Sequence, residues 1–213
     1  MKLHRLPWAI DACALLATLA APASAVTITP AVEFNLADAN VINFDPNPWT
    51  FGYEFTLSAT VTVNALGYFN DGFGQDHQVA IWSDVGGSPL VSATVLGTDP
   101  VTGNFRYQAV TEITLAAGTY RIGGEYLGDG EPLPIPVSVT RIAGLTWNGA
   151  YYRGGAGLNF PFTSGGSSYG NNGVMAPTFS VSNVPEPSTT TLALVGVALF
   201  GLLARRKAAA ARA

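Results

Sequence analysis

The stretch VTEITLAAGTYRIGGEY, residues 110–126, decides the fold class of this chain. Two segments rich in β-branched and aromatic residues flank a short Ala-Ala-Gly connection. Within it, Leu115, Gly118 and Tyr120 have the Leu-x-x-Gly-x-Tyr spacing of a tyrosine corner, in which the tyrosine hydroxyl bonds back to the preceding backbone. We expect the glycine to permit this turn, and the later pair Gly123-Gly124 to mark a bulge. The stretch therefore predicts two strands of an antiparallel β-sandwich.

Strand signals continue on both sides of this stretch, between residues 26 and 183. Short alternating or β-branched segments recur at roughly ten-residue intervals, separated by Gly, Pro, Asn and Asp, and no stretch has sustained helical periodicity. The pattern predicts an all-β fold, an antiparallel β-sandwich with a jelly-roll-like strand order. A Gly-, Ser- and Asn-rich segment, residues 154–176, is predicted to be a long surface loop. The other expected strands are residues 51–57, 60–69, 77–83, 90–96, 135–142, 144–151 and 177–181.

The first 25 residues have the three parts of a secretory signal peptide. A basic start precedes a mostly apolar run over residues 9–21, and Ala23 and Ala25 then supply the small residues that signal peptidase reads. Cleavage after Ala25 would make Val26 the first residue of the mature chain. The alternative is an uncleaved N-terminal anchor helix.

The C-terminal part has its own order of features. The sequence VPEPS at residues 184–188 precedes an uncharged apolar run, residues 191–204, and the basic cluster RRK at 205–207; residues 208–213 form a short tail. As a helix, the apolar run would extend about 21 Å, short of a ~30 Å hydrocarbon core. Flanking residues and snorkelling arginines would lengthen it to a marginal transmembrane helix. The basic cluster would stay cytoplasmic, which places the middle of the chain outside.

This C-terminal arrangement resembles the PEP-CTERM sorting signal of Gram-negative bacteria, whose members also carry a signal peptide. The resemblance implies that Pro185, Glu186 and Pro187 are recognised by exosortase, a membrane enzyme that removes the tail. It further implies a membrane-anchored precursor that is then released or passed to the cell surface, often alongside exopolysaccharide. An ordinary C-terminal anchor with a Pro-rich linker is the alternative. Residues 51–126 also resemble a β-sandwich domain of other PEP-CTERM proteins, which implies a fold and no catalytic residues.

The charge of the middle segment limits its partners. Between residues 26 and 184, four arginines and no lysine stand against twelve acidic residues, a formal net charge of −8. Such a surface repels polyanions, so we expect no nucleic-acid binding. The chain's one cysteine, Cys13, lies in the predicted leader, so the mature protein would have neither a disulfide nor thiol chemistry.

We expect no enzyme activity, because no catalytic constellation stands out. The predicted mature segment has one histidine, His77, which we expect to start a strand in an ordinary polar role. No Gly-x-Ser-x-Gly elbow and no phosphate-binding Gly-rich loop accompany it. The glutamates are expected at solvent-facing strand positions, and nothing singles out a pair for glycoside hydrolysis.

Two further groups of residues suggest binding. Hard oxygen ligands on Gly-containing turns predict a calcium site, although ordinary turn chemistry explains them equally well, and no other cofactor is expected. The calcium candidates are Asp71, Asp76, Asp129 and Glu131. Exposed aromatic side chains would stack on sugar rings, and the glycan-binding candidates are Trp147, Tyr151 and Tyr152.

The sequence thus predicts an exported cell-surface or extracellular-matrix protein with a structural or adhesive role. A carbohydrate-binding module for exopolysaccharide is the alternative.

Overall fold

Strand pairing is antiparallel throughout the part of the chain that the structure, a computed structural model, describes: residues 27–43, 46–165 and 173–182. A short 3-10 turn, η1 (Leu36–Asp38), accompanies the strands. The strands are β1 (Val32–Glu33), β2 (Ala39–Asn43), β3 (Trp49–Leu57), β4 (Val61–Phe69), β5 (His77–Ser83), β6 (Val91–Val95), β7 (Val101–Thr102), β8 (Phe105–Leu115), β9 (Gly118–Tyr126), β10 (Pro132–Pro136), β11 (Thr140–Arg141), β12 (Leu145–Gly154), β13 (Thr163–Ser164) and β14 (Pro177–Val181).

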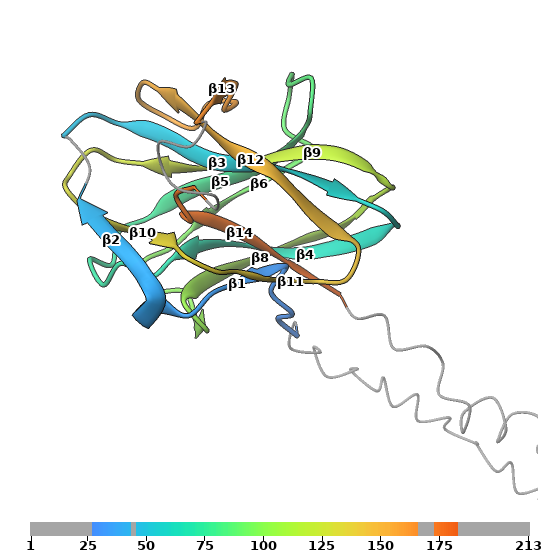
Figure 1. Cartoon of the computed structure of the whole chain (residues 1–213), viewed down its shortest axis with the longest axis horizontal. Coiled ribbons are helices and arrows are strands. Elements are labelled where there is room, and N and C mark those ends of the chain that lie inside the picture. The colour runs from blue at the N-terminus through green and yellow to red at the C-terminus, as the bar shows by residue number, and fades with distance from the viewer. Residues whose placement is uncertain (1–26, 44–45, 166–172, 183–213) are drawn as a thin grey trace, which may run out of the picture.

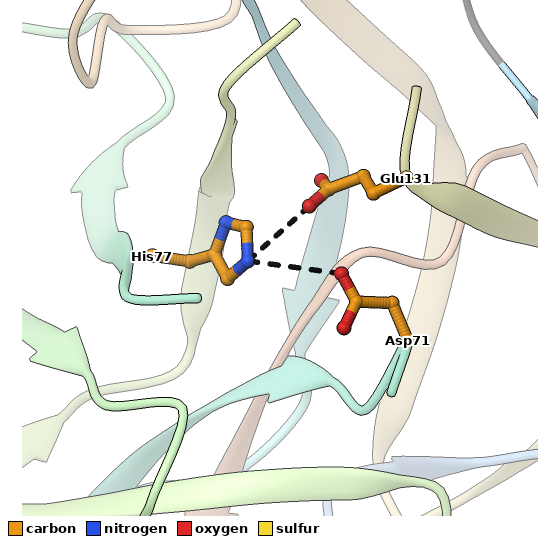
Figure 2. A group of neighbouring side chains, drawn as sticks. All are labelled: Asp71, His77 and Glu131. Atoms are coloured by element: carbon orange, nitrogen blue, oxygen red, sulfur yellow. Dashed lines mark ion pairs between the residues drawn. The ribbon is translucent and has the colours of Figure 1, made fainter. Parts of the chain in front are cut away.

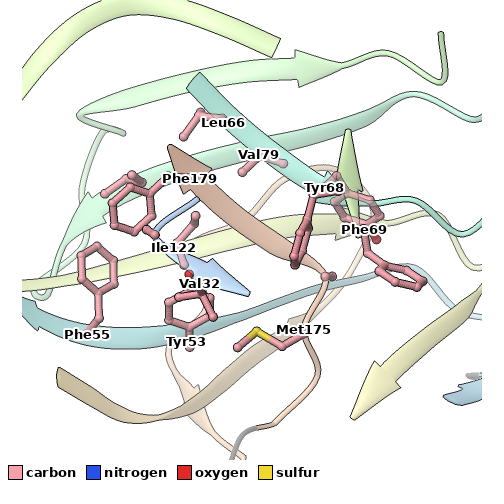
Figure 3. Packing of buried hydrophobic residues seen from close by; sticks show 14 of the residues in the cluster. Val32, Tyr53, Phe55, Leu66, Tyr68, Phe69, Val79, Ile122, Met175 and Phe179 are labelled. Carbon is pink, nitrogen blue, oxygen red and sulfur yellow. The ribbon is translucent and has the colours of Figure 1, made fainter. Parts of the chain in front are cut away.

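Two of the sheets form the layers of a sandwich (Figure 1). One has six strands in the order β13-β12-β3-β9-β5-β6, and the other has four in the order β14-β4-β8-β7. Alternate residues of both sheets point into one shared core, where Phe55 of β3 meets Phe179 of β14 with ring centroids 5.1 Å apart (Figure 3). The expectation of an all-β antiparallel fold is confirmed.

The jelly-roll-like strand order stays a prediction. The N-terminal segment joins the four-stranded sheet through a bridge between Pro30 and Ser180, which places it beside β14. Strand β12 lies between β13 and β3 in the six-stranded sheet.

The tyrosine corner joins the two layers between β8 and β9. The Tyr120 hydroxyl donates a hydrogen bond to the carbonyl oxygen of Ala116 at 3.0 Å, as the sequence predicts. The expected role of Gly118 is wrong, because its φ lies outside the left-handed region that favours glycine. A Cβ there would lie 3.6 Å from the Tyr120 ring, an ordinary contact.

Gly123 and Gly124 do not form the expected bulge. Both pair in regular register with β3 on one side and β5 on the other. A Cβ on Gly124 would lie 2.8 Å from the Tyr68 ring, and one on Gly123 would lie 2.7 Å from the methyl group of Thr50. The glycines therefore serve close packing, since any larger residue would displace these neighbours.

The predicted strand over residues 135–142 is also wrong. Two short strands, β10 and β11, occupy this region, and each has a partner, β2 or β1, that the sequence analysis did not identify. Three prolines at positions 132, 134 and 136 lie within β10 and suit a strand with one partner, because proline lacks the N–H that a central strand needs. Within the predicted loop 154–176, the structure adds β13, paired to β12, and residues 166–172 lie outside the described part.

The hydrogen bond of the tyrosine corner predicts how removal of the Tyr120 hydroxyl affects stability. Tyr120→Phe keeps the ring against Phe55 and loses the bond to Ala116, so the free energy of unfolding should fall by about 1 kcal/mol. Denaturant unfolding measures this change. Tyr151→Phe is the matched control, because its hydroxyl bonds to no described residue, and should stay within about 0.5 kcal/mol of the parent. Equal losses in both variants would contradict a stabilising role for the corner.

Candidate functional site

His77, the first residue of β5, is buried with 3% of its surface exposed. Its ring stacks on that of Tyr68 from β4, with centroids 3.9 Å apart and planes within 6°. Its Nδ1 lies 3.0 Å from the backbone carbonyl oxygen of Glu125. Because a carbonyl oxygen only accepts, Nδ1 carries the hydrogen, and a neutral ring therefore has its lone pair at Nε2.

Two carboxylates face this Nε2 atom (Figure 2). Glu131, which directly precedes β10, brings Oε2 to 3.2 Å, and Asp71, from the connection between β4 and β5, brings Oδ2 to 4.0 Å. The side chains of Glu131 and Asp71 are 0% and 5% exposed, and that of His77 is 4% exposed. One ligand atom from each residue lies within 4.8 Å of the other two. We call Asp71, His77 and Glu131 the buried cluster.

The atoms that face one another in the buried cluster are all electron-pair donors. Apart from a proton shared between the two carboxyl groups, no hydrogen-bond partner among the described residues reaches Nε2 of His77, Oε2 of Glu131 or Oδ2 of Asp71. Burial raises the pKa of Glu131 to about 9 and lowers the pKa of His77, since both charged forms lose their hydration. Either a proton held between these atoms or a bound cation removes the repulsion between them.

The second polar atom of each cluster residue is already bonded. The Tyr68 hydroxyl donates to Oε1 of Glu131 at 2.7 Å, and the Phe73 backbone N–H donates to Oδ1 of Asp71 at 2.8 Å. The Nδ1–H of His77 donates to a backbone carbonyl, as described above. Each side chain is thus held at one atom and turns the other toward the cluster centre.

The four calcium candidates are only partly brought together. Asp71 and Glu131 meet in the buried cluster, whereas Asp76 accepts a hydrogen bond from the Gly97 N–H at 2.9 Å. Asp129 accepts from the backbone N–H of Glu131 at 3.2 Å, which is turn chemistry. Both aspartates support the backbone near the buried cluster.

The sequence analysis gave His77 only an ordinary polar role at a strand start. The strand start is confirmed, but the histidine belongs to the same cluster as two calcium candidates. Its presence just after the Asp71 turn was the signal that could have identified it. The expectation of solvent-facing glutamates is wrong for Glu131 and Glu125, which are both buried.

The three glycan candidates do not form one aromatic surface. Trp147 stacks on Tyr53 with ring centroids 4.3 Å apart, and Tyr152 also packs against the core. Tyr151 lies on the opposite face of β12, where its ring covers the Arg121 guanidinium at 3.9 Å. Successive residues of a strand alternate between faces, so neighbouring tyrosines are separated by the sheet itself.

Arg121 holds the segment that follows β12 against the outer face of the six-stranded sheet. Its guanidinium pairs with the Glu54 carboxylate at 2.9 Å and donates to the Pro161 carbonyl oxygen at 3.2 Å. The rings of Tyr151 and Phe160 lie 3.9 Å and 5.1 Å from it. This part of the predicted surface loop is therefore a packed cover over the sheet.

Comparison with known proteins gives one match. Residues 183–207 match the PEP-CTERM protein-sorting motif. No curated protein and no solved structure matches the chain. The motif implies an exported protein with a membrane-anchored precursor that exosortase processes, as the sequence resemblance indicated.

The residues predicted to direct export and sorting lie outside the described part of the structure. These are the signal-peptide residues Ala23 and Ala25 and the sorting residues Pro185, Glu186 and Pro187. The predicted transmembrane run 191–204 lies outside it too. Among described residues, no helix has the length and apolar character that a membrane crossing requires.

The contacts of Arg121 predict that lysine cannot replace it. Arg121→Lys loses the planar guanidinium that serves Glu54, Pro161 and the Tyr151 ring together, so the free energy of unfolding should fall by about 2 kcal/mol. Limited proteolysis should cut residues 155–162 faster in this variant.

Arg153→Lys is the control for this prediction. Arg153 lies over the exposed ring of Phe162, so its loss should change stability by less than about 0.5 kcal/mol. Unchanged cleavage in Arg121→Lys would show that other contacts hold the segment.

Proposed function

We propose that this chain is a non-enzymatic structural or adhesive component of the cell surface or extracellular matrix. The carrying observation is the position of the sorting motif: β14, the last strand among the described residues, ends at Val181, and the motif begins at residue 183. The motif therefore sorts the β-sandwich domain. No second folded domain fits between the end of β14 and the motif.

The surface hollows support a role without catalysis. Three hollows on the described surface are lined almost entirely by neutral side chains and backbone. One lies between β6 and β8, one beside the end of β14, and one beneath the segment that follows β12. Arg153, in the last of these, is their one titratable residue. General acid–base catalysis needs groups that exchange protons near neutral pH, and arginine does not.

The contacts of the arginines within the domain and its excess of acidic residues favour partners other than polyanions. Arg121 and Arg153 cover aromatic rings, Arg141 lies 5.8 Å from the Trp147 ring centroid, and Arg106 donates to the Asp99 carbonyl oxygen at 2.8 Å. The arginines keep their charge in these contacts, but the twelve acidic residues between residues 26 and 184 outnumber them and dominate the field around the domain. Neutral polymers, basic surfaces and cation-bridged matrix are the partners that this charge allows.

Binding of exopolysaccharide through an aromatic surface remains the alternative. We place it second, because Trp147 and Tyr152 pack against the core while Tyr151 covers Arg121. A sugar-stacking surface needs exposed rings on one face. A glycan array with the purified protein tests this alternative, and retention on any acidic or neutral glycan would favour it over the structural role.

Replacing the sorting residues should prevent release from the membrane. With Pro185, Glu186 and Pro187 all changed to alanine, the chain should keep residues 191–207 and stay in the inner-membrane fraction. The parent should give a species starting at Val26 and ending near Pro187. Intact mass and cell fractionation in the native host measure both. Ser188→Ala, outside the Pro-Glu-Pro motif, is the control and should be processed like the parent.

Loss of the protein should weaken the attachment of cells to a surface or to matrix. Host cells that lack the chain, and cells that make the triple alanine variant, should both attach less than cells that make the parent or Ser188→Ala. A washed-surface cell count measures attachment. Equal attachment of all four strains, with the parent correctly released, would reject the structural or adhesive role while leaving the sorting route intact.

A further inference from the structure

We propose that Asp71, His77 and Glu131 bind one divalent transition-metal ion, with zinc as the occupant, through Oδ2, Nε2 and Oε2. This inference does not depend on the structural or adhesive role. It rests on the geometry of the buried cluster alone.

The separations within the buried cluster fit a small ion. Ligand atoms about 2.0 Å from a tetrahedral zinc ion lie about 3.3 Å from one another. The Nε2 atom of His77 lies 3.2 Å from Oε2 of Glu131 and 4.0 Å from Oδ2 of Asp71. The first distance needs no change, and the second needs a small inward rotation of Asp71, whose connection between β4 and β5 carries the exposed Phe73.

The surrounding hydrogen bonds have the pattern of an outer coordination shell. Metal-bound histidines donate their other ring N–H to a carbonyl or carboxylate, and metal-bound carboxylates are held by hydrogen bonds at their second oxygen. His77 donates to the Glu125 carbonyl, Glu131 accepts from Tyr68, and Asp71 accepts from Phe73. All three ligands are therefore oriented, and the unpartnered atoms are the ones that converge.

The ligand types favour a transition metal over the calcium that the sequence suggested. Calcium takes six to eight oxygen ligands, and an imidazole nitrogen is not among them. Imidazole with carboxylates suits zinc and its neighbours. Asp76 and Asp129, which would complete an oxygen cage, bond instead to the backbone N–H groups of Gly97 and Glu131. Three protein ligands leave the fourth position of zinc for a water molecule.

A zinc ion here would connect three separate parts of the chain. Asp71 comes from the β4–β5 connection, His77 from the start of β5, and Glu131 from the connection between β9 and β10. The ion would also neutralise two carboxylates that burial disfavours. The ion would therefore cross-link these connections at this end of the sandwich.

Thermal unfolding of the full chain with added metal tests the site. The protein is first stripped with EDTA, then supplied with zinc, cobalt(II) or calcium chloride. Saturating zinc should raise the Tm by at least about 5 °C, and calcium should not. Cobalt(II) should give visible absorption bands of a nitrogen- and oxygen-ligated ion, which zinc then removes.

Three variants separate metal binding from folding. Glu131→Gln keeps an acceptor for Tyr68 and supplies an amide N–H to Nε2 of His77, so its metal-free Tm should match or exceed that of the parent. Its zinc affinity should fall at least about 100-fold, and that of Tyr68→Phe by about 10- to 100-fold. Asp76→Asn is the matched control, because it keeps the acceptor for Gly97 and should bind zinc like the parent.

Two results would overturn the proposal. Equal zinc response in the parent and in Glu131→Gln would place the binding elsewhere and leave the buried cluster as a proton-sharing network. A Tm rise with calcium and none with zinc would reject the transition metal and restore the calcium prediction.

Discussion

The close contact between the Tyr68 ring and the backbone of β9 is the constraint on which both the core and the buried cluster depend. The ring fits only because Gly124 has no side chain, since a Cβ there would lie 2.8 Å from it. Once in place, the ring stacks on His77, and its hydroxyl holds Glu131. One position without a side chain, on a strand paired at both edges, therefore sets the plane of the imidazole and the direction of a carboxylate.

Much of the fold could be predicted from the sequence, because its strongest signals are local. Alternation at period two locates the long strands, and the Leu-x-x-Gly-x-Tyr spacing locates the corner at Tyr120. The failures came where local signals are weak. Strand β10 is a proline-rich edge that pairs only with β2, so its existence depends on a distant partner. Gly123 and Gly124 were misjudged because their neighbours come from other strands.

Only part of the candidate site could be predicted from the sequence. Asp-Gly turns indicated Asp71 and Glu131, but four acidic residues satisfied the same pattern, and the fold selects two of them. His77 joins them because β5 begins where the two connections converge, which is a long-range consequence of strand pairing. The sorting motif was easier to predict, because its processing enzyme recognises a short linear segment of the chain. Targeting signals consist of short local sequences, whereas binding sites form only when the chain folds.

The absence of cysteine from the predicted mature chain gives the buried cluster its structural importance. An exported domain of this size has no disulfide to restrain its connections, so they depend on packing and polar contacts. Two buried carboxylates beside a histidine would ordinarily weaken the fold, since their desolvation is costly. The proposed metal ion would reverse this balance, because a ligand that binds only the folded state adds its binding free energy to stability. The same three side chains would then weaken the fold without the ion and cross-link it with the ion bound.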